Sequence, residues 1–190
     1  NSKQITAVLI LKEVEKGTIK IYDPIRKYLP DFNQPWADSV TIHQLLNFSA
    51  GISNLNEPLV FQPGTDFKYG NAAYVLLGEI LEKVTQKSFS ELANQLFKQL
   101  KMKQTFCFSN ELSDKVVNGH FGINDSITLG PTMVLPAEII AAAGIVSTVE
   151  DLARWDFLLH QGKIVKPASY QLMTNYTITA QHLVFGYEKV

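Results

Sequence analysis

The sequence predicts an α+β fold that is rich in helix, and three features of the 190-residue chain lead to this prediction. Several segments carry apolar residues at the spacing of one helical face. Serine, threonine or proline stands where most of these segments begin, as is typical of helix starts. Strand-like patterns occur mainly in residues 101–140 and in the C-terminal tail.

The first predicted helix covers residues 4–16, and its first half is apolar on nearly every side. A helix with this pattern is usually buried almost all round. Gly17 follows and suits the left-handed conformation that ends many helices. The apolar residues are Ile5, Val8, Leu9, Ile10 and Leu11.

Two short helices are predicted next. The first starts at Pro24, whose fixed φ suits a first turn, and ends near Leu29. The second has Thr41 as its N-cap and runs through Phe48, before Gly51.

Two longer helices follow. Residues 71–85 carry apolar side chains at a spacing of 3.6. Ser88 and Glu91 have the spacing of a capping box, in which each side chain bonds the backbone N–H of the other residue. We therefore expect a helix from Ser88 to about Leu100.

The C-terminal half is less regular. A second capping box, formed by Ser147 and Glu150, should open a helix that ends near His160. Pro167 suits the first position of a last helix, which ends near Met173.

The tail is expected to be an incoming strand. Val184, Phe185 and Tyr187 give it apolar and aromatic residues with strand preference. Together with the strand-like pieces of residues 101–140, this indicates part of an antiparallel sheet beside the helices.

The composition excludes several classes of function. Hydrophobic residues make up 46% of the chain and charged residues 18%, as in globular proteins. Seventeen basic and 18 acidic residues give a net charge of −1, without the concentrated positive field that nucleic acids or anionic membranes require. No apolar stretch reaches the roughly 18 residues that span a bilayer.

No metal or cofactor is expected. Cys107 is the single cysteine, so the chain can form neither an internal disulfide nor a thiolate cluster. The four histidines are scattered without the spacing of a zinc site, and no glycine-rich phosphate loop is present. These histidines are His43, His120, His160 and His182.

Lys3 lies at the start of the apolar helix, where a charged amine is costly unless it is paired or used. An amine in such surroundings can give up its proton and act as a general base. A serine three residues earlier would lie on the same helical face. That position precedes Asn1, and Ser2 should point elsewhere. On this pattern alone, a solvated lysine at a frayed helix start is the better interpretation.

Tyr69 and Asn71 lie in a loop directly before the helix of residues 71–85. A tyrosine beside a lysine can relay a proton, and an asparagine amide can hold a substrate carbonyl. Tyr-x-Asn alone is too short to indicate a site. Tyr74 is interpreted as a packing residue, and Gly144 as a position of close backbone approach.

Four blocks of sequence carry a resemblance to a known family. They are NSKQITAVLILKEVEKGTIKIYDPIRKYLPDF (1–32), TIHQLLNFSAGI (41–52), FQPGTDFKYGNAAYVLLGEILEKVT (61–85) and AAGIVSTVEDLARW (142–155). In this order they resemble the serine β-lactamase and penicillin-binding-protein superfamily, in its class C β-lactamase-like branch. This branch includes D-alanyl-D-alanine carboxypeptidase and esterase relatives.

The resemblance implies a β-lactamase/transpeptidase-like fold, a helical subdomain beside an antiparallel sheet. Residues 1–190 are then expected to be a partial domain that lacks the nucleophile-bearing N-terminal segment and the C-terminal strands. Lys3 matches the lysine of Ser-x-x-Lys, whose serine would directly precede Asn1. Tyr69 and Asn71 match the second motif, and the third motif would lie beyond Val190.

The function that the resemblance implies is serine hydrolysis. An acyl-enzyme would form on an amide, lactam or ester carbonyl, as in a β-lactamase, a D-Ala-D-Ala carboxypeptidase or an esterase. Lys3 and Tyr69 would be catalytic and Asn71 would bind a small-molecule or peptide substrate, whereas the fragment without its serine would be inactive. A non-catalytic binding homologue is the alternative from another class. The family implies a periplasmic or cell-envelope location and leaves the oligomeric state open.

Overall fold

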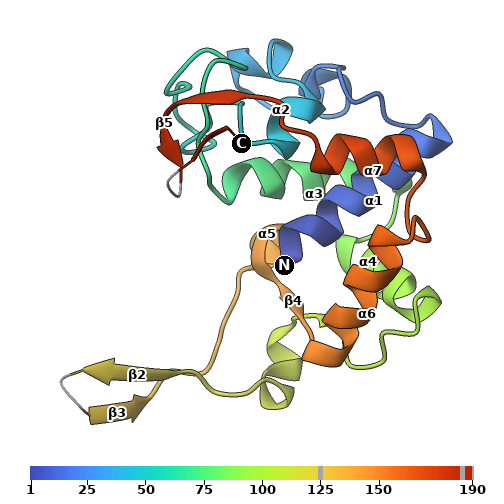
Figure 1. Cartoon of the computed structure of the whole chain (residues 1–190). Helices are drawn as coiled ribbons and strands as arrows, with labels where there is room; N and C mark the ends of the chain where they lie inside the picture. Colours follow the sequence, from blue (N-terminus) through green and yellow to red (C-terminus); the bar gives the residue numbers. More distant parts are fainter. Residues whose placement is uncertain (124–125, 185–186, 190) are drawn as a thin grey trace.

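The structure is a computed structural model that describes residues 1–123, 126–184 and 187–189 (Figure 1). It consists of helices with short pairs of antiparallel strands. The α-helices are α1 (Ser2–Lys16), α2 (Ile42–Leu46), α3 (Ala72–Thr85), α4 (Phe89–Gln99), α5 (Ile140–Ala143), α6 (Val149–His160) and α7 (Pro167–Thr174). The 3₁₀ helices are η1 (Ile25–Lys27), η2 (Pro35–Asp38), η3 (Asn110–Lys115) and η4 (Ala137–Ile139). The strands are β1 (Phe106–Cys107), β2 (His120–Ile123), β3 (Ser126–Leu129), β4 (Ile145–Val146), β5 (Thr179–Val184) and β6 (Tyr187–Lys189).

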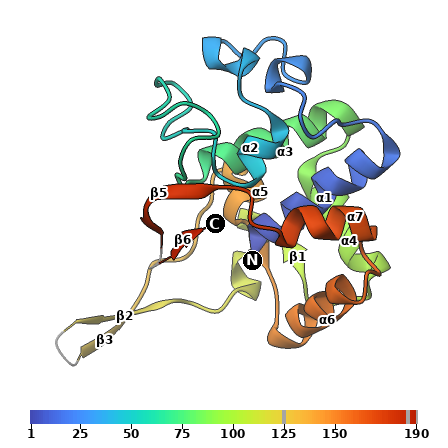
Figure 2. The same cartoon turned by 45° about the horizontal axis from the view of Figure 1, so that its top comes forward.

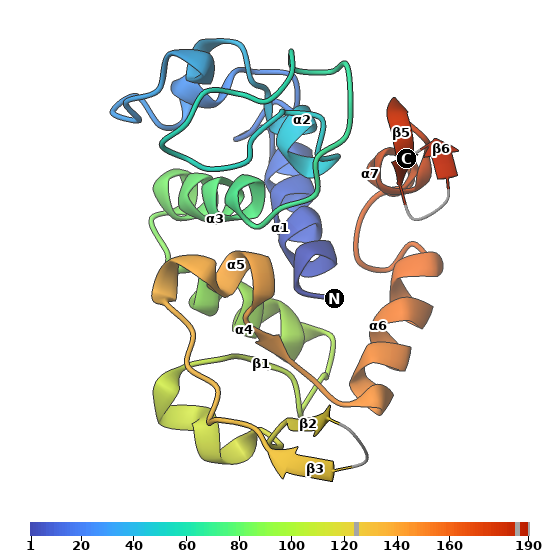
Figure 3. The ribbon, with the colours of Figure 1, turned by 90° about the vertical axis from the view of Figure 1, so that its left-hand side faces the viewer.

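Helix α1 lies at the centre of the molecule and packs against α3, α4, α5 and α7. Figure 3 shows α3 and α5 on one side of α1 and α7 on the other. The predicted apolar residues of α1 are all buried, so the expectation of a helix covered nearly all round is confirmed. Each such side chain removed from water contributes about 1.5–3 kcal/mol. Gly17 ends the helix with φ 80°, in the left-handed region.

Helix α2 begins as predicted and ends earlier than predicted. The Thr41 side chain accepts a hydrogen bond from the Gln44 N–H, and the Gln44 side chain accepts one from the Thr41 N–H. The helix stops at Leu46 instead of Phe48, because Phe48 takes a left-handed backbone conformation with φ 62°. The short helix expected after Pro24 is the 3₁₀ helix η1.

The capping box before α4 is confirmed. Ser88 accepts a hydrogen bond from the Glu91 N–H at 3.2 Å, and the Glu91 carboxylate accepts one from the Ser88 N–H at 2.8 Å. Both contacts satisfy N–H groups that the first turn of the helix leaves free.

The capping box expected at Ser147 and Glu150 is wrong by one residue. Thr148 is the N-cap of α6, and its hydroxyl accepts a hydrogen bond from the Asp151 N–H at 3.3 Å. Ser147 is instead hydrogen-bonded to the hydroxyl of Thr105 at 2.7 Å. This long-range contact competes with the local pattern that the sequence presents.

The described strands form three antiparallel pairs, β1 with β4, β2 with β3, and β5 with β6. The β2–β3 hairpin projects from the helical body (Figures 1 and 2). The tail is confirmed as strand, with Val184 in β5 and Tyr187 in β6, whereas Phe185 lies outside the described residues. The α+β class, helix-rich with part of an antiparallel sheet, is confirmed.

Candidate active site

The start of α1 is fixed against the segment that contains α5 and β4. The Ser2 hydroxyl accepts a hydrogen bond from the Ile145 N–H at 3.0 Å. The Thr6 hydroxyl donates one to the Ala141 carbonyl at 2.6 Å. Both hydroxyls are buried, so these bonds replace water as their partners. The first turn of α1 is therefore anchored, and Ser2 faces Ile145 as part of this anchor.

Two acceptors hold the Lys3 amine. Its Nζ donates to Asn71 Oδ1 at 2.8 Å and to the Ala142 carbonyl at 2.9 Å. The side chain is half-buried, and these partners offset the cost of placing an amine there. The interpretation as a solvated lysine at a frayed end does not fit this geometry.

Tyr69 lies beside the same amine. Lys3 Nζ is 4.9 Å from the centroid of the Tyr69 ring, a distance suited to a cation–π contact. About half of Tyr69 remains exposed, at 54%. The structure thus brings Lys3, Tyr69 and Asn71 together, from the start of α1 and from the loop before α3.

Tyr74 lies beside the Phe48 ring, with 5.1 Å between centroids, and is a packing residue, as interpreted from the sequence. Its ring is buried, and its hydroxyl donates to the Leu46 carbonyl at 3.0 Å. Burial, together with a smaller contribution from Tyr69, raises the pKa of Tyr74 far above its ordinary value. Tyr74 therefore stays neutral while its ring lies 5.7 Å from Lys3 Nζ.

A mainly apolar cavity of about 340 Å³ begins at Lys3 and extends between α1, α2 and the end of α7. His43 lies in its wall, and partial burial lowers the pKa of this imidazole. The remaining lining residues are Gln4, Ala7, Leu11, Ile21, Leu46, Asn47, Tyr74, Leu172, Met173, Asn175 and Thr177.

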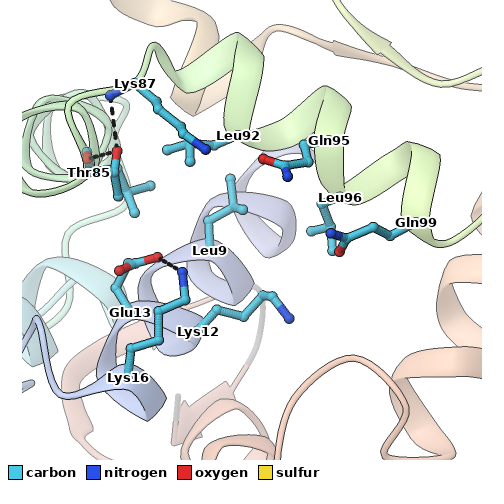
Figure 4. A pocket seen from close by; sticks show the side chains of 11 residues that line it. Leu9, Lys12, Glu13, Lys16, Thr85, Lys87, Leu92, Gln95, Leu96 and Gln99 are labelled. Carbon is cyan, nitrogen blue, oxygen red and sulfur yellow. Dashed lines mark hydrogen bonds and ion pairs between the residues drawn. The ribbon is translucent and has the colours of Figure 1, made fainter.

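A second hollow, of about 530 Å³, lies at the opposite end of α1 (Figure 4). Its Glu13 carboxylate accepts hydrogen bonds from Lys16 at 2.5 Å and from the Thr18 hydroxyl at 2.7 Å. Lys12 and Lys87 also line it. It contains amines and a carboxylate that is already bound, and none of Lys3, Tyr69 and Asn71 lines it, so we place the candidate active site at Lys3.

Two further groups near Lys3 were missed by sequence reasoning. The Ala142 carbonyl holds the amine, yet a backbone acceptor leaves no mark in a side-chain pattern. Phe48 lies 4.8 Å from Tyr69 between ring centroids. The sequence indicated Phe48 only by its position in the block of residues 41–52 that resembles the family.

The close backbone approach that was expected at Gly144, next to the site, is confirmed. A Cβ at this position would lie 2.7 Å from Ile140 Cα. In the described part of the chain, no cluster of histidine, cysteine, aspartate or glutamate could hold a metal ion. None of the helices described is long and apolar enough to cross a membrane.

Comparison with known proteins gives consistent matches. The family model described as "Beta-lactamase" matches residues 1–189. Protein flp of Staphylococcus aureus strain MW2 is 25% identical over 185 residues, with 82% of this chain and 36% of the relative covered. A beta-lactamase of Escherichia coli K12 is 27% identical over 172 residues, with 81% and 45% covered.

Solved structures show the same fold. The octameric penicillin-binding protein homologue from Pyrococcus abyssi has a TM-score of 0.79 and 26% identity, with 97% of this chain and 49% of that chain covered. A D-amino acid amidase from Ochrobactrum anthropi has a TM-score of 0.78 and 22% identity, with 90% and 58% covered. The chain spans less than half the length of these two curated relatives, flp and the E. coli beta-lactamase. The match over nearly all of its residues nevertheless shows that the chain belongs to the beta-lactamase family.

Proposed function

We propose that the protein containing this chain is a serine hydrolase that forms an acyl-enzyme on an amide, lactam or ester carbonyl. In this proposal Lys3 and Tyr69 are catalytic, Asn71 binds the substrate, and the nucleophilic serine directly precedes Asn1. The observation that carries the proposal is the hydrogen bond from Lys3 Nζ to Asn71 Oδ1, which joins two sequence motifs 68 residues apart.

The geometry of the amine suits a general base. A neutral amine has two N–H bonds and one lone pair. The two N–H bonds can donate to Asn71 Oδ1 and to the Ala142 carbonyl. The lone pair then points away from both acceptors. A serine one turn earlier on the same helix would be a neighbour of Lys3 and could deliver its proton to that lone pair.

The other two residues have complementary roles. The Oδ1 atom of Asn71 is taken by Lys3, which leaves its NH₂ group to donate to a substrate carbonyl. Tyr69 lies against the amine with half its side chain exposed, so it can pass a proton between Lys3 and the departing group of the substrate. Water would then release the acyl group.

The test is acylation of the complete protein, followed by intact-mass spectrometry after incubation with a fluorophosphonate or a penicillin. We expect Lys3→Ala to slow acylation by about 10²–10⁴, the range for loss of a positioned proton acceptor. Lys12→Ala is the matched control, because Lys12 is on the same helix and its Nζ donates to the Ile164 carbonyl at 3.3 Å, away from the site.

Normal labelling of Lys3→Ala would contradict the proposed role of the amine. An unaltered protein that resists both probes would favour the non-catalytic binding homologue instead. Melting temperatures of both variants separate loss of chemistry from loss of fold.

A further inference from the structure

Phe48 has a backbone conformation that is unusual for a bulky residue. Its φ of 62° lies in the left-handed region, where the Cβ atom crowds the backbone. Glycine or asparagine takes this conformation at lower cost. A phenylalanine held there needs compensation from its surroundings, and such strain is concentrated at functional sites.

The compensation comes from the aromatic ring. The Phe48 ring centroid lies 4.8 Å from that of Tyr69, 5.1 Å from that of Tyr74 and 5.7 Å from that of Phe67. Aromatic pairs at such separations attract one another beyond the effect of burial alone. Phe48 therefore packs directly against the candidate proton-relay tyrosine.

The backbone of Phe48 fixes the same loop. Its carbonyl accepts a hydrogen bond from the Lys68 N–H at 2.9 Å, one residue before Tyr69. Next to it, the Ser49 carbonyl accepts one from the Gly64 N–H at 2.7 Å. The end of α2 is thereby tied to the loop that carries Tyr69, through both the ring and the backbone of Phe48.

Tyr69 depends on this support because about half of the residue is exposed to solvent. Tyr69 is 54% exposed, and its ring centroid lies 4.8 Å from that of Phe48 and 4.9 Å from Lys3 Nζ. Lys3 itself donates hydrogen bonds to Asn71 and Ala142, and neither of these bonds involves the Tyr69 side chain. Loss of the Phe48 ring would release Tyr69 and leave Lys3 in place.

We infer that Phe48 is a positioning residue, whose strained backbone and ring hold the Tyr69 ring beside the Lys3 amine. The expected effect of Phe48 on catalysis rests on the proposed function, in which Tyr69 relays a proton. Misplacement by about 1 Å can cost about 10²-fold in rate, so the tilt of an exposed tyrosine matters for proton transfer.

Three variants of the complete protein separate the ring from the backbone. Phe48→Leu keeps apolar volume and removes the ring, Phe48→Gly removes both the ring and the strain, and Phe48→Tyr keeps the ring. We expect Leu and Gly to slow acylation by a fluorophosphonate by about 10- to 100-fold and to change its pH profile. Phe48→Tyr should acylate within about threefold of the unaltered protein.

A second measurement follows Tyr69 itself. In protein labelled with ¹³C-tyrosine, the Tyr69 ring signals are assigned by their loss in Tyr69→Phe. We expect these signals to move in Phe48→Leu and Phe48→Gly, because the neighbouring ring is gone, and to stay close to their original positions in Phe48→Tyr.

The inference is overturned if Phe48→Leu and Phe48→Gly acylate at the unaltered rate and pH profile. It is also overturned if all three variants lose activity and melting temperature in parallel, since that result marks a purely structural residue. Failure of the proposed function looks different, because the unaltered protein then resists the probe. In that case, Tyr69 signals that do not move in Phe48→Leu would overturn the positioning of Tyr69 by Phe48. Signals that do move would support this positioning, without a role in catalysis.

Discussion

At the scale of single residues, the Lys3 amine connects three parts of the chain. It begins on α1, and its acceptors are Asn71 before α3 and the carbonyl of Ala142 in α5. Stability alone would favour an apolar residue in this half-buried position, as at Ile5 and Val8 further along the helix. The two hydrogen bonds offset that penalty and also orient the amine.

Burial of His43 predicts a dependence of stability on pH. The imidazole is partly desolvated, which lowers its pKa below the ordinary value of 6.5. The unfolded state therefore binds the proton more readily, so stability is fully present above about pH 6.5 and is lost as the pH falls through the folded-state pKa.

We expect His43→Gln to reduce the slope of unfolding free energy against pH on the acid side of about pH 6.5. Urea unfolding followed by circular dichroism at several pH values measures this slope. The same variant at pH 8 provides the reference for packing changes, since the histidine is then neutral in both states. An unchanged slope would show that burial of His43 does not govern the acid side of the stability curve.

The candidate site was predictable only where side chains carry information. Lys3, Tyr69 and Asn71 were predicted as site residues because their motifs stand in the right order within the four blocks that resemble the family, and the structure brings them together. The Ala142 carbonyl was not found, because every residue has a carbonyl. Phe48 was predicted to end a helix. Its left-handed backbone was not predicted, because the ring contacts that accompany it are with residues distant in the chain.

At the scale of elements, local side-chain caps mark the starts of α2, α4 and α6. The Ser88–Glu91 capping box was predicted from spacing and is formed by hydrogen bonds in both directions. The prediction failed at α6, because Ser147 bonds to Thr105 from a different part of the chain. Capping patterns are thus reliable where no tertiary partner competes for the hydroxyl.

The Ser88 cap has a measurable consequence. Ser88→Ala removes the acceptor of the Glu91 N–H, and we expect a loss of about 1 kcal/mol in unfolding free energy. Chemical denaturation of both proteins measures the difference. Ser53→Ala, in an exposed loop, is the control and should change stability by less than about 0.5 kcal/mol. Equal stability of Ser88→Ala and the unaltered protein would mean that water replaces the cap without cost.

At the scale of the whole molecule, helix α1 organises both the core and the candidate site. Its almost continuous apolar surface predicted a helix buried nearly all round, and in the structure it packs against α3, α4, α5 and α7. Helix α5 was not predicted, because a four-residue segment is too short to display a helical period. The segment from α5 to β4 nevertheless determines how the first turn of α1 is anchored.

The contact between α3 and α5 connects the core to that anchor. A Cβ on Gly78 in α3 would come within 2.6 Å of the Cβ of Ala141 in α5. The neighbouring carbonyls of Ala141 and Ala142 hold Thr6 and Lys3. Displacing α5 should therefore disturb packing and the amine together.

We expect Gly78→Ala to lower the unfolding free energy by about 1–3 kcal/mol through overpacking, offset by about 1 kcal/mol of higher helix propensity. In the complete protein it should also slow acylation, since the acceptor of Lys3 moves. The double variant Gly78→Ala/Ala141→Gly restores the space by exchanging the two side chains across the contact. Denaturation and probe labelling should therefore both recover in the double variant. The contrary result is a double variant that recovers stability but not the acylation rate. The packing of α3 and α5 would then be restored without restoring activity, which would show that this contact does not position the Lys3 amine.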